Sequence, residues 1–146
     1  MASYFKAVRR VEFSETDMAG IVHFSNFFRY METVEHGFYR SLGFSVILSG
    51  FNRPIGLPRV HASFDFKRPL RFEDSFLIEL FVLEKKEKTL TYRIRISRSN
   101  EMNEPLEECA LGKLIVVCVE RQSDGAFKSI PIPEEIHSKI EVFETP

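Results

Sequence analysis

The sequence predicts an α+β fold in which an antiparallel five-stranded sheet wraps around one long helix. Three observations support this prediction. One segment near the N-terminus has apolar residues at spacings of three and four, the period of an amphipathic helix. Later segments alternate apolar and polar residues, as half-buried strands do, and short polar turns that join neighbouring strands antiparallel connect most of them. A helix and a sheet that each have one apolar face bury those faces against each other.

The first two predicted elements are a strand and the long helix. Residues 5–13 mix apolar and basic side chains and are typical of a strand. Ser25 is expected to be the N-cap of the helix, because its hydroxyl can accept a hydrogen bond from a first-turn amide. Gly43 is expected to end the helix in a left-handed conformation, with Phe44 folding back. The helix would be about 17 residues and ~25 Å long. Its apolar face consists of Phe27, Met31, Val34, Phe38 and Leu42.

A glycine inside the helix and a glycine- and proline-containing segment after it carry further predictions. Gly37 lies inside the helix, where glycine costs about 1 kcal/mol relative to alanine. A close approach between helix and sheet would explain why a glycine occurs there. Residues 45–59 contain two glycines and two prolines and are expected to form a loop.

Four further strands are expected after the loop. Residues 60–67 alternate, with Val60, Ala62, Phe64 and Phe66 on one face, so a half-buried strand is expected. The next strands are expected at residues 76–84, 90–97 and 106–120, joined by the polar turns EKKEKT and SNEMNEP. A short helix is expected to begin near Pro133.

Length and composition limit the classes of protein to which the chain can belong. The 146 residues are expected to form a single domain, residues 1–146. The 20 basic and 21 acidic residues argue against nucleic acid as a partner, which requires a basic surplus. No signal peptide is apparent, and the longest apolar run, LIVVCV, is too short for a membrane span.

The two cysteines indicate the compartment. Cys109 and Cys118 lie on one expected strand, which would separate them by roughly 30 Å. A disulfide requires Cα atoms within about 7 Å, so the two thiols cannot pair within the chain. A reducing, cytoplasmic location is therefore expected.

The predicted order of one strand, a long helix and four strands is that of the hot-dog fold. Within it, residues 15–27 read ETDMAGIVHFSNF, and this segment resembles the 4-hydroxybenzoyl-CoA thioesterase family of hot-dog acyl-CoA thioesterases. The likeness continues through KRPLRFEDSF, ALGKLIVVCV and IPIPEEI, and it covers nearly the whole chain.

The resemblance implies an acyl-CoA thioesterase that hydrolyses a small aromatic or a short- or medium-chain acyl-CoA to the free acid and CoA. Asp17 is the residue that matches the family's catalytic aspartate, which acts as nucleophile or general base. CoA would be part of the substrate, and no separate cofactor is expected. The first amides of the helix lack internal partners and favour negative charge, so amides around Phe24 can polarise the thioester oxygen, and Gly20 lets the loop approach the substrate closely. The expected oxyanion and substrate contacts are Gly20, Val22, His23, Phe24 and Asn26.

Two of these positions depart from the family pattern. His23 stands where the family commonly has an aromatic residue, and Phe24 stands where tyrosine or histidine is frequent. His23 can act as a base, orient Asp17 or fill the aromatic position. Asn26 can bond the loop at the start of the helix or contact the substrate. Both departures affect the expected acyl group, but not the acid.

Other polar residues carry alternative interpretations. Glu32 can be interpreted as the helical catalytic acid of a second branch of hot-dog thioesterases, but Asp17 better matches the branch that this segment resembles. Glu35 and His36 are expected on a solvated helix face. The acids and histidines have no metal-site spacing, so no metal is expected. The hairpin lysines either form a solvated turn that discourages aggregation or bind the phosphates of CoA. These phosphate candidates are Lys85, Lys86 and Lys88.

Two other functions remain open on the sequence. A hot-dog dehydratase or hydratase would use a histidine with an acid, and His23 is the candidate histidine. An acyl-CoA-binding module without turnover would use the same pocket. The resemblance also implies a homodimer or homotetramer, with pockets between the subunits.

Overall fold

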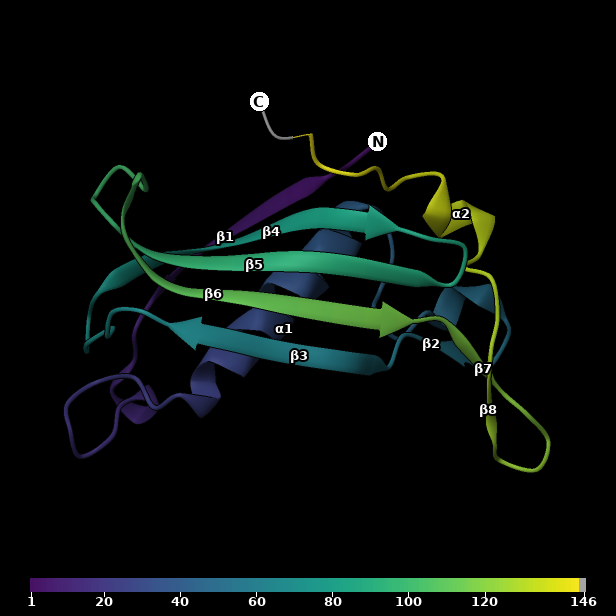
Figure 1. The fold of residues 1–146 in the computed structure, drawn as a ribbon, viewed down its shortest axis with the longest axis horizontal. Helices are drawn as coiled ribbons and strands as arrows, with labels where there is room; N and C mark the ends of the chain where they lie inside the picture. Colours follow the sequence, from purple (N-terminus) through teal and green to yellow (C-terminus); the bar gives the residue numbers. More distant parts are fainter. Residues whose placement is uncertain (145–146) are drawn as a thin grey trace.

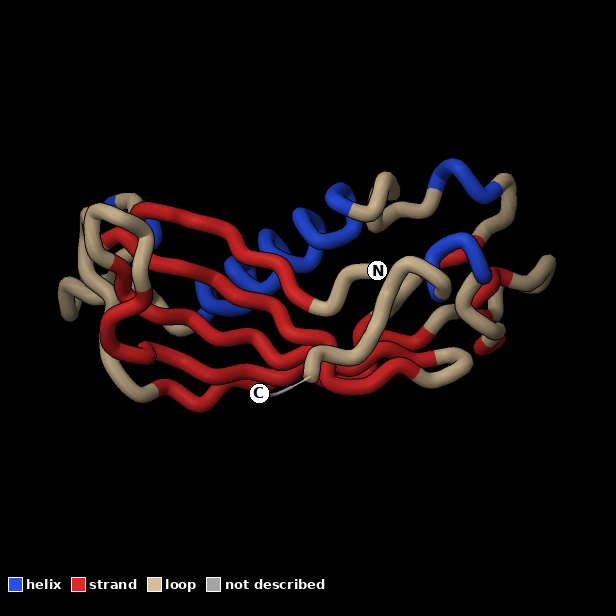
Figure 2. Tube along the Cα trace, turned by 90° about the horizontal axis from the view of Figure 1, so that it is seen from above, coloured by secondary structure: helices blue, strands red, loops and turns tan. Residues whose placement is uncertain are grey.

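The computed structural model describes residues 1–144 and has one five-stranded antiparallel sheet crossed by one long helix (Figure 1). The helix is α1 (Ser25–Ser41), and Figure 2 shows it along one side of the curved sheet. The strand order is β1-β4-β5-β6-β3, which confirms the predicted architecture. The strands are β1 (Tyr4–Arg10), β3 (Arg59–Phe66), β4 (Ser75–Lys85), β5 (Thr89–Ser99) and β6 (Pro105–Val117).

A second, small sheet lies beside one end of the main sheet. It consists of β2 (Ile55–Gly56), β7 (Val119–Arg121) and β8 (Phe127–Ser129). The prediction of one strand over residues 106–120 was therefore wrong. The Cys118 amide donates to the Lys88 carbonyl, and the chain beyond it leaves the main sheet to pair with β2 and β8.

Smaller elements occupy the remaining connections. The first strand ends at Arg10 rather than at residue 13, and a 3₁₀ turn, η1 (Phe13–Glu15), follows it. The segment expected as a loop contains β2 and a second 3₁₀ turn, η2 (Ser49–Phe51). The short helix α2 (Glu134–His137) begins directly after Pro133, as predicted.

The two ends of α1 differ in how far the prediction holds. Phe24, not Ser25, is the N-cap, and no side chain caps the first turn. Ser25 is inside the helix, and its hydroxyl lies 2.8 Å from the His23 Nδ1 atom. At the other end, Gly43 has a φ of 93°. The Phe44 amide donates to the Tyr39 carbonyl, which closes the expected left-handed stop.

The core lies between α1 and the helix-facing side of the sheet. All five residues of the predicted apolar helix face are buried. They pack against side chains from β4, β5 and β6, which alternate inward along each strand. Tyr39 and Tyr92 meet inside this core with their hydroxyl oxygens 2.7 Å apart. Cys109 and Cys118 are free, as predicted, and both are buried.

Strand β3 is an edge of the main sheet, and its surface corrects the expected half-buried face. Val60 is 62% exposed and Phe66 is 50% exposed. Ala62 is exposed as well, and only Phe64 is partly buried, against Phe27 and Phe28 of α1. The alternation identified a strand correctly, but a single chain leaves most of its apolar face uncovered.

Gly37 allows α1 to approach β1 closely. A Cβ atom added at this position would lie 2.5 Å from Cε2 of Phe5, closer than a van der Waals contact permits. We expect Gly37→Ala to lower the free energy of unfolding by about 1 kcal/mol, because overpacking of about 1–3 kcal/mol exceeds the helix-propensity gain of about 1 kcal/mol. Urea unfolding measures this change.

The Gly37 test has a control and a rescue. A Cβ atom at Gly50 meets no atom within 4 Å, so Gly50→Ala should leave the stability within experimental error or raise it. Adding Phe5→Ala to Gly37→Ala should remove the steric cost. Equal effects of Gly37→Ala with and without Phe5 would contradict the assigned contact.

Candidate active site

The segment between η1 and α1 folds into a tight turn that presents Asp17. The Asp17 amide donates to the Ile21 carbonyl and the Gly20 amide donates to the Asp17 carbonyl, each at 2.9 Å. Gly20 has a φ of 79°, a left-handed conformation that glycine adopts without strain. The Ala19 amide donates to Oδ1 of Asp17 at 2.9 Å. The turn therefore fixes the side chain of Asp17 as well as its backbone.

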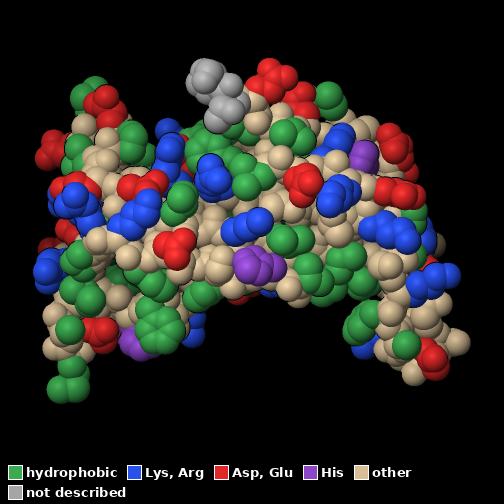
Figure 3. Space-filling view, viewed as in Figure 1, with side chains coloured by type: hydrophobic (Ala, Val, Ile, Leu, Met, Phe, Trp, Pro, Cys, Tyr) green, Lys and Arg blue, Asp and Glu red, His purple; other side chains and the backbone are tan. Residues whose placement is uncertain are grey.

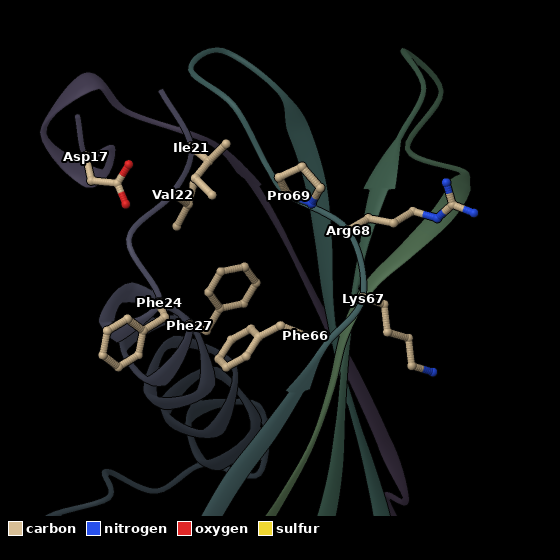
Figure 4. Close-up of a pocket in the computed structure, with 9 residues that line it drawn as sticks. All are labelled: Asp17, Ile21, Val22, Phe24, Phe27, Phe66, Lys67, Arg68 and Pro69. Carbon is tan, nitrogen blue, oxygen red and sulfur yellow. The ribbon is translucent and has the colours of Figure 1, made fainter. Parts of the chain in front are cut away.

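Asp17 lies on the wall of a cavity of about 440 Å³ (Figure 4). Its side chain is exposed, and its Oδ2 atom has no hydrogen-bond partner within the described part of the chain. Figure 4 shows the carboxylate on the same side of the cavity as Val22, opposite Pro69. The other lining residues are Ile21, Phe24, Phe27, Phe66, Lys67 and Arg68. A carboxylate thus faces a mostly apolar cavity with a basic rim.

The start of α1 offers amide donors beside this carboxylate. The Val22 amide donates to the Leu70 carbonyl and the His23 amide to the Glu15 carbonyl, so both are occupied. The Phe24 amide has no acceptor among residues 1–144, and the Ser25 amide has only the His23 ring at 3.3 Å. Free amides at a helix N-terminus attract negative charge. The Phe24 amide can therefore bind a developing oxyanion.

Of the other predicted contact residues, two line the cavity and three lie outside its lining. Val22 and Phe24 line the cavity, whereas Gly20, His23 and Asn26 are not part of its lining. The His23 ring lies on the Phe24 ring, with centroids 4.7 Å apart. Asn26 Nδ2 donates to the Glu15 carbonyl at 2.8 Å, so it ties the helix start to the turn.

The predicted phosphate lysines lie far from Asp17 within one chain. Figure 1 shows the β4–β5 turn, which carries Lys86 and Lys88, at the opposite end of the sheet from the Asp17 turn. The ammonium group of Lys85 donates to two carbonyl groups, those of His137 and Ile140. These lysines therefore do not meet the cavity of their own chain.

Sequence reasoning missed the basic residues at the cavity rim. Lys67 and Arg68 follow β3 directly and line the cavity, although the sequence assigned them no role. Figure 4 shows both side chains extending away from Asp17. Lys67 is paired with Glu108, and Arg68 forms no salt bridge with a described residue. The only sequence signal was their place in the motif KRPLRFEDSF, just beyond a strand end.

A second polar cluster lies farther along α1 and corrects an expectation. Glu35 was expected on a solvated helix face, but its side chain is fully buried. Its Oε1 atom accepts from the Arg59 guanidinium at 2.5 Å, while its Oε2 atom is buried without a partner among the described residues. His36 Nε2 lies 3.7 Å from Glu32 and 3.9 Å from Glu35. We call Glu32, Glu35, His36 and Arg59 the Arg59 cluster.

The environment of Glu35 predicts a specific pH dependence of stability. Burial raises the pKa of Glu35 above 4.5, and Glu32 adds to this, whereas Arg59 opposes it. The folded chain therefore holds this proton more tightly than the unfolded chain. The contribution of Glu35 to the free energy of unfolding is fully present below the unfolded pKa of 4.5 and falls as the pH rises through the folded pKa.

We expect Glu35→Gln to remove this pH-dependent loss of stability. The free energy of unfolding of Glu35→Gln minus that of the wild type should increase as the pH rises from about 4 to about 8, because only the wild type loses stability at Glu35. Urea unfolding at several pH values measures the difference between the two proteins, so other titrating groups cancel. A difference that is constant over this range would contradict the raised pKa of Glu35.

The chain matches a known protein family and is similar to solved structures. The family model described as the thioesterase-like superfamily matches residues 11–140. The chain belongs to the thioesterase-like superfamily. A structure of the 4-hydroxybenzoyl-CoA thioesterase from Pseudomonas covers 94% of this chain and 99% of its own, with a TM-score of 0.83. At 21% identity this similarity concerns the fold alone, and it confirms the hot-dog fold.

Two curated proteins are similar to this chain in sequence. A protein of Aquifex aeolicus with a provisional esterase name is 42% identical over 86 residues, 58% of this chain. That match spans 65% of the Aquifex protein, less than two thirds of its length. The 1,4-dihydroxy-2-naphthoyl-CoA hydrolase of Nostoc punctiforme is 32% identical over 141 residues, 88% of this chain and 80% of that protein.

Neither a metal site nor a membrane-spanning helix is found among the described residues. Within residues 1–144 no group of three or more histidine, cysteine, aspartate or glutamate side chains is placed to hold a metal ion. None of the described helices is both long enough and apolar enough to cross a membrane.

Proposed function

We propose that this chain is an acyl-CoA thioesterase that hydrolyses a small aromatic acyl-CoA, with the Asp17 carboxylate as its catalytic nucleophile or general base. The observation that carries the proposal is the placement of one carboxylate with a free oxygen on the wall of an apolar cavity, beside an unoccupied helix-start amide. The name of the Nostoc relative, a hydrolase of an aromatic CoA ester, supports the aromatic class.

The leaving group explains why one carboxylate suffices. CoA departs as a thiolate, and an ordinary thiol has a pKa of roughly 8.5. Strong general-acid assistance is therefore unnecessary. What the reaction needs is a nucleophile or an activated water, together with a donor for the oxyanion. Asp17 is the candidate for the first role, and the Phe24 amide, which has no acceptor among the described residues, is the candidate for the second.

Asp17 can act in two ways, and ¹⁸O found in Asp17 after a single turnover would identify the first of them. As a nucleophile, the carboxylate attacks the thioester carbon, CoA thiolate leaves, and water then hydrolyses the resulting anhydride. As a general base, it takes a proton from the water that attacks the carbon directly. In a single turnover in H₂¹⁸O, direct attack by water places ¹⁸O in the product acid. The anhydride path, when water attacks the enzyme carbonyl, instead places ¹⁸O in Asp17.

The rim residue Arg68 is the candidate for the phosphates of CoA. Its side chain lies at the cavity rim and extends away from Asp17 (Figure 4), and a long pantetheine arm can span such a separation between the reacting carbonyl and the phosphates. We expect Arg68→Ala to raise KM for a CoA ester by about 10-fold, the effect of losing one charge-assisted hydrogen bond. The KM for the N-acetylcysteamine ester of the same acid, which lacks phosphates, should not change.

The hairpin lysines provide the comparison for Arg68. A Lys85→Ala/Lys86→Ala variant should leave both KM values unchanged if the phosphates bind at the rim. A rise in KM for the CoA ester in this variant, and not in Arg68→Ala, would indicate that the hairpin lysines and not Arg68 bind the phosphates.

The proposal includes an oligomeric state and a cellular location. A homodimer or homotetramer in the cytoplasm fits the free edge of β3 and two buried free thiols. Sedimentation that gives only a 17.0 kDa species would contradict the assembly.

A panel of CoA esters tests the function and its alternatives together. Release of free thiol from aromatic esters by the wild type supports the proposal. Preference for short or medium fatty acyl esters would change the substrate class. Binding without thiol release would indicate an acyl-CoA-binding module, and water addition to an enoyl ester would indicate a hydratase.

A further inference from the structure

Two groups that the proposed reaction needs lie on one short stretch of chain, and no helix or strand contains both. The Asp17 carboxylate comes from the turn before α1, and the unoccupied amide belongs to Phe24 at the helix start. Figure 4 shows Asp17 on the turn and Phe24 where the helix begins. Between them the chain passes through Gly20, whose backbone no side chain restricts. A fixed separation of the two groups therefore depends on hydrogen bonds across the turn.

The two ends of the turn meet at the carbonyl group of Glu15. Thr16 and Val22 form an isolated antiparallel bridge. Next to this bridge, the Glu15 carbonyl accepts from the His23 amide at 2.9 Å and from Asn26 Nδ2 at 2.8 Å. A carbonyl oxygen has two lone pairs, so these two donors occupy it fully. One acceptor thus holds both the returning chain and the first turn of α1.

Asn26 also fixes the free amide at the helix start. Its backbone amide donates to the His23 carbonyl at 2.9 Å. That carbonyl and the Phe24 amide belong to one peptide group, which is planar and trans, so the C=O and N–H bonds point in opposite directions. The bond from the Asn26 amide therefore sets the direction of the Phe24 N–H bond as well.

We propose that Asn26 is a positioning residue of the reaction, which holds the Asp17 turn through its side chain and the Phe24 amide through its backbone. This inference rests on the proposed function. Asn26 is 8% exposed and does not line the Asp17 cavity, so it acts on the reaction through these two groups and not through the substrate.

Glu15, the partner of Asn26, is itself anchored to the main sheet and to α1. Its Oε1 atom accepts from the Glu12 amide at 2.9 Å, and its Oε2 atom lies 3.4 Å from Nη2 of Arg9 on β1. Nη1 of Arg9 lies 3.4 Å from Oγ1 of Thr33 on α1. The Glu15 side chain is 14% exposed, so salt screens this ion pair less than a fully exposed one. Asn26 therefore bonds to a residue that two rigid elements hold in place, as precise positioning requires.

Removal of the Asn26 side chain should lower kcat and leave KM unchanged. We expect Asn26→Ala to lower kcat for 4-hydroxybenzoyl-CoA by about 10- to 100-fold, because a small displacement of reacting groups has an effect of this size. KM should not change, because no residue of the cavity lining is altered. Steady-state thiol release by protein that circular dichroism shows to be folded measures both constants. An unchanged kcat, or a rise in KM alone, would overturn the inference.

Ser41 provides a matched control at the other end of α1. Its hydroxyl donates to the Phe38 carbonyl at 2.6 Å, so Ser41→Ala also removes a partly buried side-chain hydrogen bond to a backbone carbonyl. This variant should unfold at a lower urea concentration than the wild type and keep the wild-type kcat. An equal fall in kcat in Ser41→Ala and Asn26→Ala would assign the effect to helix stability and overturn the inference.

Asn26→Asp is a second variant, which tests the side-chain donor by itself. The introduced carboxyl has nearly the shape of the carboxamide, and it can donate to the Glu15 carbonyl only when it is protonated. Burial beside a carbonyl oxygen favours the protonated form. The kcat of Asn26→Asp relative to the wild type should therefore rise as the pH falls from about 8 to about 5, whereas the ratio for Asn26→Ala should stay constant.

Other titrating groups do not produce this difference. Glu15, Arg9 and His23 lie near the position and occur in all three proteins, so their own titration cancels in the ratio. A ratio for Asn26→Asp that stays at the Asn26→Ala value at every pH would overturn the inference.

Amide hydrogen exchange separates a failure of this inference from a failure of the proposed function. The His23 amide shares its acceptor with Asn26, so its exchange should become about 10-fold faster in Asn26→Ala and stay unchanged in Ser41→Ala. Unchanged exchange of the His23 amide in Asn26→Ala, measured by NMR, would overturn the inference whatever the activity. A wild type that releases no thiol from any CoA ester would overturn the proposed function instead.

Discussion

Replacing Asp17 by asparagine is expected to lower kcat for aromatic acyl-CoA hydrolysis by about 10²- to 10⁴-fold, the range for loss of an acid–base group. The asparagine oxygen can still accept from the Ala19 amide, so the turn should keep its shape. The variant loses the negative charge that attacks the thioester or activates water. Steady-state thiol release should show a large fall in kcat with a small change in KM, because the cavity is retained.

Asp124 provides a matched control for the Asp17 substitution. Its Oδ1 atom accepts from the Ala126 amide at 2.9 Å, the same local geometry that Asp17 has with Ala19. Asp124 lies in the exposed β7–β8 turn and does not line the Asp17 cavity. Asp124→Asn should therefore leave kcat unchanged. Equal activity of the wild type and Asp17→Asn would remove Asp17 from the mechanism.

The largest effect on stability is expected at the opposite end of α1. Phe38 is fully buried, and its ring packs edge-on against Tyr39 and Tyr92. Phe38→Ala should lower the free energy of unfolding by about 3–5 kcal/mol, because it removes a large apolar side chain and leaves a cavity. Urea unfolding at neutral pH measures the loss.

Phe24 is the matched comparison for Phe38. It precedes the same helix, but it is 60% exposed and lines the Asp17 cavity. Phe24→Ala should change the unfolding free energy by less than about 1 kcal/mol and should raise KM instead. A large loss of stability in Phe24→Ala, or a small one in Phe38→Ala, would contradict the assignment of these two rings to the site and the core.

The sequence predicted the helix and the sheet because both depend on local periodicity. The apolar positions of α1 and the left-handed stop at Gly43 follow from spacing and from the freedom of glycine. The strand break at Cys118 did not follow, because the residues on both sides of it are apolar. It follows instead from the pairing of β7 with β2 and β8, which lie far from it or beyond it in the chain.

The site was predictable to the extent that it depends on consecutive residues. The turn around Asp17 and the helix start adjoin in sequence, so their proximity was expected. The rim residues Lys67 and Arg68 come from the end of β3 and reach the cavity only through tertiary packing. The burial of Glu35 could not be predicted for the same reason, because its partner Arg59 lies far away in the sequence and meets it only in the folded chain.

The most direct test of the central claim is thiol release from aromatic CoA esters by the unmodified chain. We expect steady release of one CoA thiol for each acid formed from 4-hydroxybenzoyl-CoA or 1,4-dihydroxy-2-naphthoyl-CoA. A folded wild-type protein that binds these esters and releases no thiol from any of them would contradict it.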